Sequence, residues 1–306
     1  MNPQQSRRTF LQLSAAAGLT LSLPGVAATG PRQMDQRLIP GTDETIPVIG
    51  LGTSDEFESV PADGGTQLKA VLATLAEHGG TLVDTAPAYG DSERVLGEFL
   101  ADLDLGQRIF ISTKVGTQGR EEGRQSLEGS QRLLQISPLD LVMVHSMRDA
   151  ATQLDNLEEW KEAGRVRYIG ITTSRESGFA QMEQLVRKRK LDFIQVNYSP
   201  FEMRAAERVI PAAAERGVAV MINRAFGNGT YFGRIAGQKL PDWTAEFDCD
   251  SWAQLSLKYI LGNPDVTCVL AATSNPRHMA DNAGAGSGRL PDAATRQRIA
   301  SFLQEL

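Results

Sequence analysis

The stretch LVDTAPAYGDSERVLGEFL, residues 82–100, shows the pattern from which the fold of this 306-residue chain can be predicted. A short apolar run ends at the acid Asp84, and Tyr89 follows five positions later in a turn that contains glycine and serine. From Ser92 onward, apolar residues recur every three or four positions, which is typical of a helix. An ionisable acid at the end of a buried strand is costly unless it is paired. The stretch therefore predicts a strand, a turn and a helix, with a partner for Asp84.

The same alternation of apolar run and helical window recurs along the chain. Near-continuous apolar strands separated by helices indicate a parallel sheet covered on its faces. Eight such units predict one closed (β/α)8 TIM barrel, an α/β fold. The apolar runs are 48–53, 82–85, 109–114, 139–145, 166–172, 191–198, 218–223 and 266–273. Helical windows are expected at 66–78, 91–102, 154–163, 178–190, 204–216 and 251–261.

The barrel is expected to fill residues 35–306 as a single domain, since no linker or charge block divides them. Residues 37–53 are expected to begin it with a β-hairpin, because two apolar runs flank the turn residues 41–43. The longest irregular piece, 224–248, follows the seventh strand and is rich in glycine and aromatic residues. Loops of that length are usually functional or disordered.

The first 28 residues form a separate segment that begins with the twin arginine Arg7-Arg8. The apolar stretch that follows is too short and too weak for a permanent membrane span. It ends in small residues at 26–28, which is typical of a removable export signal. The Ser-Arg-Arg-x-Phe-Leu pattern resembles the twin-arginine (Tat) signal, which implies export of the folded protein to the periplasm by the Tat machinery. An N-terminal amphipathic helix is the alternative.

Composition excludes several classes of function. The net charge of −6 argues against nucleic acid as a main partner, because binding to phosphates needs a basic face. The cysteines Cys249 and Cys268 form no metal-binding motif, so two free thiols are expected, although a single bridge remains possible. No metal site is expected, because the three histidines are scattered along the chain.

Four residues able to carry chemistry follow neighbouring strands. Asp84 and Tyr89 follow the second strand, Lys114 ends the third and His145 ends the fourth. In a TIM barrel the carboxyl ends of the strands meet at the functional face. We expect Asp84 to pair with Lys114, and Lys114 to lower the pKa of Tyr89 from about 10.

A tyrosine with a lowered pKa can act as a general acid at neutral pH. His145 can then donate a hydrogen bond to the same substrate oxygen. A carbonyl bound between Tyr89 and His145 leaves its carbon open to a nucleophile, and a hydride from a nicotinamide cofactor fits that role.

The chain resembles the aldo-keto reductase superfamily over nearly all of residues 35–306. The resemblance implies that Asp84, Tyr89, Lys114 and His145 form the catalytic tetrad of an NADPH-dependent carbonyl reductase with a TIM-barrel fold. The motifs that carry it, besides Lys114 and His145, are GLGT (50–53), DTAPAYGDSE (84–93), YIGIT (168–172), QVNYSPF (195–201) and SNPRHMADN (274–282).

The resemblance also implies cofactor contacts, with NADPH preferred and NADH possible. Gln195 matches a glutamine that binds the nicotinamide amide. Thr172 and Thr173 stand where the family often has Ser-Asn, and Asn223 stands where it often has a stacking aromatic, which Phe226 can replace. The last strand–helix loop would hold the adenosine phosphate at a helix N-terminus. The full set of expected cofactor contacts is Gly52, Thr53, Thr172, Thr173, Gln195, Asn223, Arg224, Phe226, Thr273, Ser274, Arg277 and Asn282.

The expected reaction is therefore reduction of a small aldehyde or ketone to the alcohol, with Tyr89 as general acid. Tyr231, Phe232 and Trp243, from the long piece after the seventh strand, are expected to line the substrate pocket. The alternative is a redox-sensing or scaffold subunit that binds the cofactor with little turnover, suggested by the altered positions Thr173 and Asn223.

Overall fold

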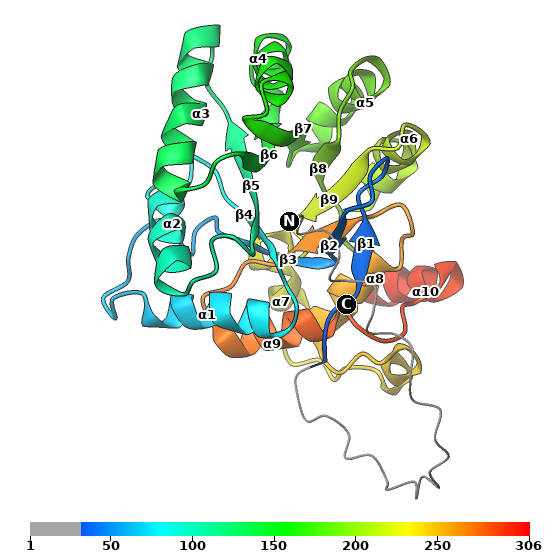
Figure 1. Ribbon diagram of the computed structural model, residues 1–306. Helices are drawn as coiled ribbons and strands as arrows, with labels where there is room; N and C mark the ends of the chain where they lie inside the picture. Colours follow the sequence, from blue (N-terminus) through cyan, green and yellow to red (C-terminus); the bar gives the residue numbers. More distant parts are fainter. Residues whose placement is uncertain (1–31) are drawn as a thin grey trace, which may run out of the picture. The chain divides into compact units, whose positions relative to one another are not determined.

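The computed structural model describes residues 32–306, so the expected export signal at 1–28 lies outside the described residues. Eight parallel strands close into a barrel in the order β10-β3-β4-β5-β6-β7-β8-β9 (Figure 1). This confirms the (β/α)8 barrel that the apolar runs predict. The strands are β3 (Ile49–Gly52), β4 (Leu82–Asp84), β5 (Phe110–Val115), β6 (Leu139–Val144), β7 (Val166–Thr173), β8 (Phe193–Asn197), β9 (Ala219–Asn223) and β10 (Cys268–Leu270).

Helices lie outside the ring of strands and cover it (Figure 1). Each turns a buried apolar stripe inward, as Leu154 and Leu157 of α4 do. The helical window at 204–216 is divided, because Arg208 leaves the helical backbone region with φ −143°. A 3-10 turn (Arg204–Glu207) precedes that break. The helices around the barrel are α1 (Thr66–Glu77), α2 (Ser92–Asp102), α3 (Arg120–Leu134), α4 (Ala150–Glu162), α5 (Phe179–Lys188), α6 (Val209–Glu215), α8 (Trp252–Leu261), α9 (Pro276–Gly284) and α10 (Ala293–Gln304).

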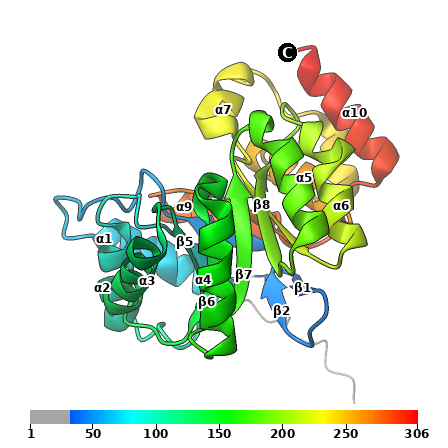
Figure 2. The same ribbon diagram turned by 90° about the horizontal axis from the view of Figure 1, so that it is seen from above.

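A hairpin precedes the barrel, as expected, but it is shorter than the pattern suggests. Strands β1 (Gln36–Leu38) and β2 (Thr45–Pro47) pair antiparallel, whereas β3 leaves the hairpin to join the barrel. Ile39 and Ile46 belong to one buried apolar cluster with side chains of the barrel strands. The cluster includes Leu82, Phe110 and Phe193, the first residues of three strands, so the hairpin closes the N-terminal end of the barrel. Figure 2 shows the hairpin and helix α7 (Thr230–Arg234) at opposite ends of the strands.

The piece after β9, expected to be irregular, contains ordered short helices. Helix α7 and two 3-10 turns, Gly227–Gly229 and Asp242–Phe247, divide it. Aromatic rings order the segment by packing on one another; the centroids of Phe226 and Phe232, for example, are 5.0 Å apart.

Two further expectations concern residues 32–306. Cys249 and Cys268 are both buried and free. Within the described range, no helix is both long enough and apolar enough to cross a membrane.

Candidate active site

An ion pair between Asp84 and Lys114 lies at the carboxyl ends of β4 and β5. The Lys114 Nζ is 2.7 Å from Asp84 Oδ2, and the two side chains are 1% and 5% exposed. Lys114 also donates to the carbonyl of Thr85 at 2.9 Å. The partner that the acidic strand end requires is therefore present, as the sequence predicts. Without each other, these two buried charges would be strongly destabilising.

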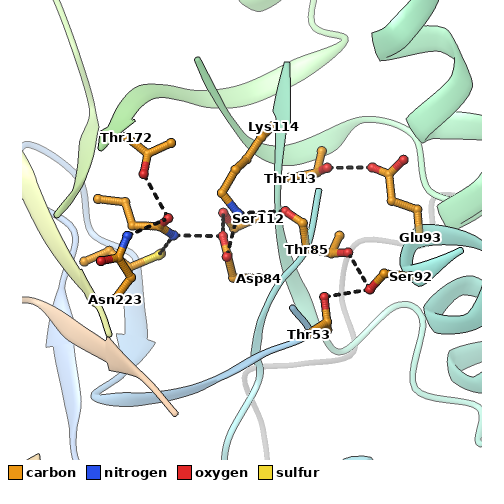
Figure 3. Close-up of polar contacts among 12 residues, drawn as sticks. Thr53, Asp84, Thr85, Ser92, Glu93, Ser112, Thr113, Lys114, Thr172 and Asn223 are labelled. Carbon is orange, nitrogen blue, oxygen red and sulfur yellow. Dashed lines mark hydrogen bonds and ion pairs between the residues drawn. The ribbon is translucent and has the colours of Figure 1, made fainter. Parts of the chain in front are cut away.

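Asp84 accepts two further hydrogen bonds. Ser112 Oγ and Gln195 Nε2 donate to Asp84 Oδ1 at 2.7 Å and 3.0 Å (Figure 3). The Asp84 carboxylate on β4 is thus held by side chains from two other strands. Ser112 and Lys114 lie on β5, and Gln195 lies on β8. The carboxylate has a fixed orientation, and the ammonium has a fixed counter-ion.

Tyr89 lies in the turn between β4 and α2, beside both the ammonium and an imidazole. Its ring centroid is 4.9 Å from Lys114 Nζ and 5.8 Å from the ring of His145, which it meets at 89°. Burial raises the pKa of Tyr89, and the nearby charge of Lys114 only partly offsets this effect. The expectation that Lys114 brings this pKa below 10 is therefore wrong. Desolvation of the phenolate outweighs the attraction of the cation, and Asp84 and Asp55 add to the increase.

His145 follows β6 directly and is half-buried. Burial, together with the charge of Lys114, lowers the pKa of His145 to about 4. The ring is therefore neutral at pH 7, and it can donate from one nitrogen only. The backbone after it is strained, since Ser146, Met147 and Asp149 all have φ near +50°.

A cavity of about 580 Å³ opens at this end of the barrel. Its volume falls within the roughly 300–1,000 Å³ of small-molecule sites. Lys114 lies outside the cavity wall and contacts Asp84, which is part of that wall. Of the site residues predicted from the sequence, the following line the cavity: Gly52, Thr53, Asp84, Tyr89, His145, Thr172, Gln195, Asn223, Arg224, Phe226 and Phe232.

Amide side chains form one wall of the cavity. Gln195 Oε1 accepts from Thr172 Oγ1 at 3.0 Å and from Asn223 Nδ2 at 3.4 Å (Figure 3). Asn223 Oδ1 is buried and has no hydrogen-bond partner among residues 32–306. An unpaired buried acceptor is costly, so this oxygen is suited to a ligand that brings an N–H group.

Two of the three expected substrate-pocket residues are elsewhere. Only Phe232 lines the cavity. Tyr231 is buried behind it and donates to the carbonyl of Trp252 at 2.8 Å. Trp243 packs edge-on against Phe302, with centroids 5.9 Å apart. These two rings order the segment after β9, and the expectation that they line the pocket is wrong.

The remaining cofactor candidates do not line the cavity. Thr173 Oγ1 bonds the backbone of Arg175. Thr273, Ser274 and Arg277 flank the start of α9, which follows the lining residue Ala272 closely. Asn275 caps that helix by accepting from the Arg277 N–H at 3.0 Å. Farther along α9, Asn282 is buried.

Two acidic residues of the loop after β3 line the cavity but are not predicted by the sequence analysis. Asp55 and Glu56 line the cavity, although only Gly52 and Thr53 of this segment are expected to contact a ligand. Their position in the sequence indicates such a role, because both acids lie within four residues of the end of β3, and TIM barrels carry their functional residues in the loops after strands. The other lining residues that were not anticipated are Ser54, Ser146, Ser174, Ala225, Asn228, Gly229, Leu270 and Ala272.

Known proteins share both the sequence pattern and the fold. The aldo-keto reductase YhdN of Bacillus subtilis is 27% identical over 203 residues, covering 60% of this chain and 59% of its own length. The NADH-specific methylglyoxal reductase of Escherichia coli is 23% identical, covering 82% of this chain and 93% of its own. A solved aldo/keto reductase from Klebsiella pneumoniae, in complex with NADP and acetate, superposes with a TM-score of 0.74 at 21% identity. That alignment covers 89% of this chain and 95% of the other.

A comparison with whole protein families gives the same result. The model of the aldo/keto reductase family matches residues 48–300, which is well over half of the chain. The matched range contains all eight barrel strands, the Asp84–Lys114 pair, Tyr89 and His145. The chain therefore belongs to the aldo/keto reductase family of oxidoreductases.

Proposed function

We propose that the protein reduces a small aldehyde or ketone to the alcohol with NADPH or NADH, with Tyr89 as the general acid. The observation that carries the proposal is the arrangement around one cavity: a phenol, a neutral imidazole beside it, and a buried ammonium 4.9 Å from the phenol ring. A carbonyl oxygen that accepts from both Tyr89 and His145 has its developing charge stabilised by two donors.

The rise in the pKa of Tyr89 fits the role of a general acid. Because burial raises its pKa, Tyr89 keeps its proton at neutral pH and holds it at Oη until a substrate oxygen can receive it. Proton release leaves a phenolate, and the nearby ammonium of Lys114 stabilises that charge as it forms. Burial alone would lower the pKa of Lys114, but Asp84 and, to a smaller extent, Tyr89 together outweigh it and raise this pKa. Lys114 is therefore kept protonated and in place.

The cavity residues fit a nicotinamide nucleotide. Asn223 Oδ1, which is buried and unpaired, can accept from a carboxamide N–H, and Gln195 and Thr172 are its polar neighbours. When bound, the reduced ring supplies a hydride to the carbonyl carbon. Arg224 lines the cavity and has no ion pair among residues 32–306, so it is free to meet a phosphate.

The adenosine end of the nucleotide is assigned to the start of α9. Backbone N–H groups at a helix N-terminus favour phosphate, and Thr273 and Ser274 precede this helix directly. The exposed Arg277 is the candidate for the 2′-phosphate that distinguishes NADPH from NADH. We propose NADPH as the preferred cofactor, although relatives differ, since one binds NADP and another is NADH-specific.

Nucleotide titration combined with turnover tests the proposal. Protein fluorescence should be quenched by NADPH at lower concentration than by NADH, and 4-nitrobenzaldehyde should be reduced as NADPH is consumed. Tight binding of nucleotide without turnover of any aldehyde would support a redox-sensing or scaffold subunit instead. Failure to bind either nucleotide would refute both functions.

We also propose that residues 1–28 direct export of the folded protein by the Tat machinery to the periplasm. The Arg7-Arg8 pair and the weakly apolar stretch after it support this proposal. Cell fractionation after substitution of both arginines by lysine tests it. The parent chain should be recovered from the periplasm and the variant from the cytoplasm. Equal distribution of the two would contradict the proposed route.

A further inference from the structure

Two carboxylates that form no ion pair within residues 32–306 line the wall of the candidate active site. Asp55 and Glu56 line the cavity that contains Tyr89 and His145. Among residues 32–306, neither forms a hydrogen bond or ion pair through its side chain, although nineteen ion pairs occur elsewhere in that range. The two acids are therefore available to a molecule in the cavity.

Three hydrogen bonds fix the loop that carries them. The N–H of Phe57 donates to the carbonyl of Thr53 at 3.1 Å, and the hydroxyl of Thr53 accepts from Ser92 at 2.8 Å. The Asp91 N–H donates to the carbonyl of Glu58 at 3.0 Å. Both sides of the acidic turn are thus attached, and the fully buried Phe57 ring anchors the loop to the core.

The same loop packs directly against the turn that holds Tyr89. Gly90 has φ +53°, and a Cβ at that position would lie 2.8 Å from the carbonyl oxygen of Glu58. Only glycine permits this approach, so the acidic loop and the tyrosine are held close together. The electrostatic effect is visible at the phenol, because Asp55 contributes to the raised pKa of Tyr89.

The other charges of the cavity wall are balanced. Asp84 is neutralised by Lys114, and His145 is uncharged at pH 7 because its pKa is about 4. Arg224 is assigned above to a cofactor phosphate, which removes its charge from the balance. With a nucleotide bound, the carboxylates of Asp55 and Glu56 remain as the uncompensated charge of the cavity wall.

An exposed aromatic ring adds a second feature suited to a cation. Phe232 also lines the cavity and is 43% exposed, which is unusual for so large an apolar side chain. The face of an aromatic ring attracts a cation, and an ammonium group between a carboxylate and a ring is stabilised by both.

Resting on the reductase function proposed above, we infer that Asp55, assisted by Glu56, selects carbonyl substrates that carry a positive charge. Aldehydes or ketones with an amino, quaternary ammonium or guanidino group are favoured, and oxo acids and other anionic carbonyl compounds are disfavoured. Asp55 is thus a specificity-determining residue for this site.

A matched pair of aldehydes tests this inference. The rate constant kcat/KM is measured for 4-(trimethylammonio)benzaldehyde and for 4-formylbenzoate, in the full-length protein and in its Asp55→Asn variant. Asparagine keeps the shape of the side chain and tolerates the left-handed backbone of Asp55, φ +68°. The two aldehydes differ in intrinsic reactivity, but this difference is the same for both proteins. The change in their ratio between parent and variant therefore isolates the effect of the charge.

The cation-to-anion ratio of kcat/KM should fall by about tenfold in Asp55→Asn, the scale expected for one charge a few ångströms away in a partly hydrated site. Glu56→Gln should lower it less. Asp43→Asn, which makes the same change of net charge at the exposed hairpin turn, should leave the ratio as it is in the parent. Added salt should lower the parent ratio, since exposed charges are screened.

Two results would overturn the inference, and they are distinguishable. If the parent reduces both aldehydes and Asp55→Asn has the same ratio, Asp55 does not select for charge, and the reductase function stands. If the parent reduces neither these aldehydes nor neutral 4-nitrobenzaldehyde with either nucleotide, the reductase function fails and the inference fails with it.

Discussion

The two ends of the barrel are built on opposite principles. At the N-terminal end, the hairpin fills the opening with Ile39 and Ile46, each 1% exposed. Around it Glu44 accepts from Tyr168 at 2.7 Å and pairs with Arg167, which also pairs with Asp140 at 2.6 Å. Glu44, Arg167 and Asp140 are thus all paired at this end.

The C-terminal end leaves several groups unsatisfied. Asn223 Oδ1 has no partner, Asp55 and Arg224 have no ion pair within the described part of the chain, and both of these residues have φ above +50°. A buried charge pair, Asp84–Lys114, replaces the apolar filling of the other end. One end of the barrel therefore contributes stability, whereas the other keeps unpaired and strained groups that can interact with a ligand.

The first prediction compares the removal of one tyrosine hydroxyl at each end of the barrel, and it concerns the greatest change in activity. Tyr89→Phe should lower kcat/KM for aldehyde reduction by about 10²–10⁴-fold, since it removes the proton donor. Nucleotide affinity and the thermal midpoint should change little. The matched variant Tyr168→Phe, at the N-terminal end, should keep the parent kcat/KM and lose about 1 kcal/mol of unfolding free energy with its bond to Glu44. Retention of most activity by Tyr89→Phe would remove Tyr89 from its proposed role.

The next effect tests whether the buried ion pair serves stability or chemistry. Lys114→Met should lower the free energy of unfolding by about 3–5 kcal/mol, because it leaves Asp84 charged and unpaired in the interior. The double variant Asp84→Asn/Lys114→Met should recover most of that loss in urea denaturation, yet remain inactive. An active double variant would show that the ammonium has no part in the reaction.

A smaller loss of stability is expected from a substitution in the hairpin that closes the N-terminal end of the barrel. Ile46→Ala should reduce the free energy of unfolding by about 2–4 kcal/mol through the cavity it creates. Leu38→Ala, at a hairpin position that is 52% exposed, is the control and should change it by less than about 0.5 kcal/mol. Both variants should keep the parent kcat/KM at a temperature where they are folded. A catalytic defect in Ile46→Ala without unfolding would mean that the two ends are coupled.

The smallest effect concerns the pH dependence of stability. His145 has an ordinary pKa of 6.5 and a folded-state pKa of about 4, so the unfolded chain binds its proton more readily. Its contribution to stability is therefore complete above pH 6.5 and is lost as the pH falls toward 4. His145→Gln should show a shallower decline of unfolding free energy over this window than the parent does. Parallel curves for the two proteins would show that the imidazole is not held neutral by the fold.

Much of the architecture is determined by sequence alone. The eight apolar runs predict the barrel strands, because strands buried on both faces must be apolar throughout. The register of Asp84, Lys114 and His145 at successive strand ends also predicts that they meet, since parallel strands bring their carboxyl ends to one face. The apolar character of each run and the order of the runs along the chain are properties of the sequence, and for this reason they can be read directly.

Tertiary structure decides which aromatic side chains face the cavity and how the ionisable groups behave. Phe232, Tyr231 and Trp243 all lie in the same aromatic-rich piece of the sequence, but only Phe232 reaches the cavity. The short helices after β9 turn Tyr231 into the core and pack the half-buried Trp243 against Phe302. The pKa of Tyr89 rises although a cation lies beside it, since burial depends on all surrounding atoms and outweighs one favourable charge. Proximity of charges can be inferred from spacing along the chain, whereas desolvation exists only once the chain has packed.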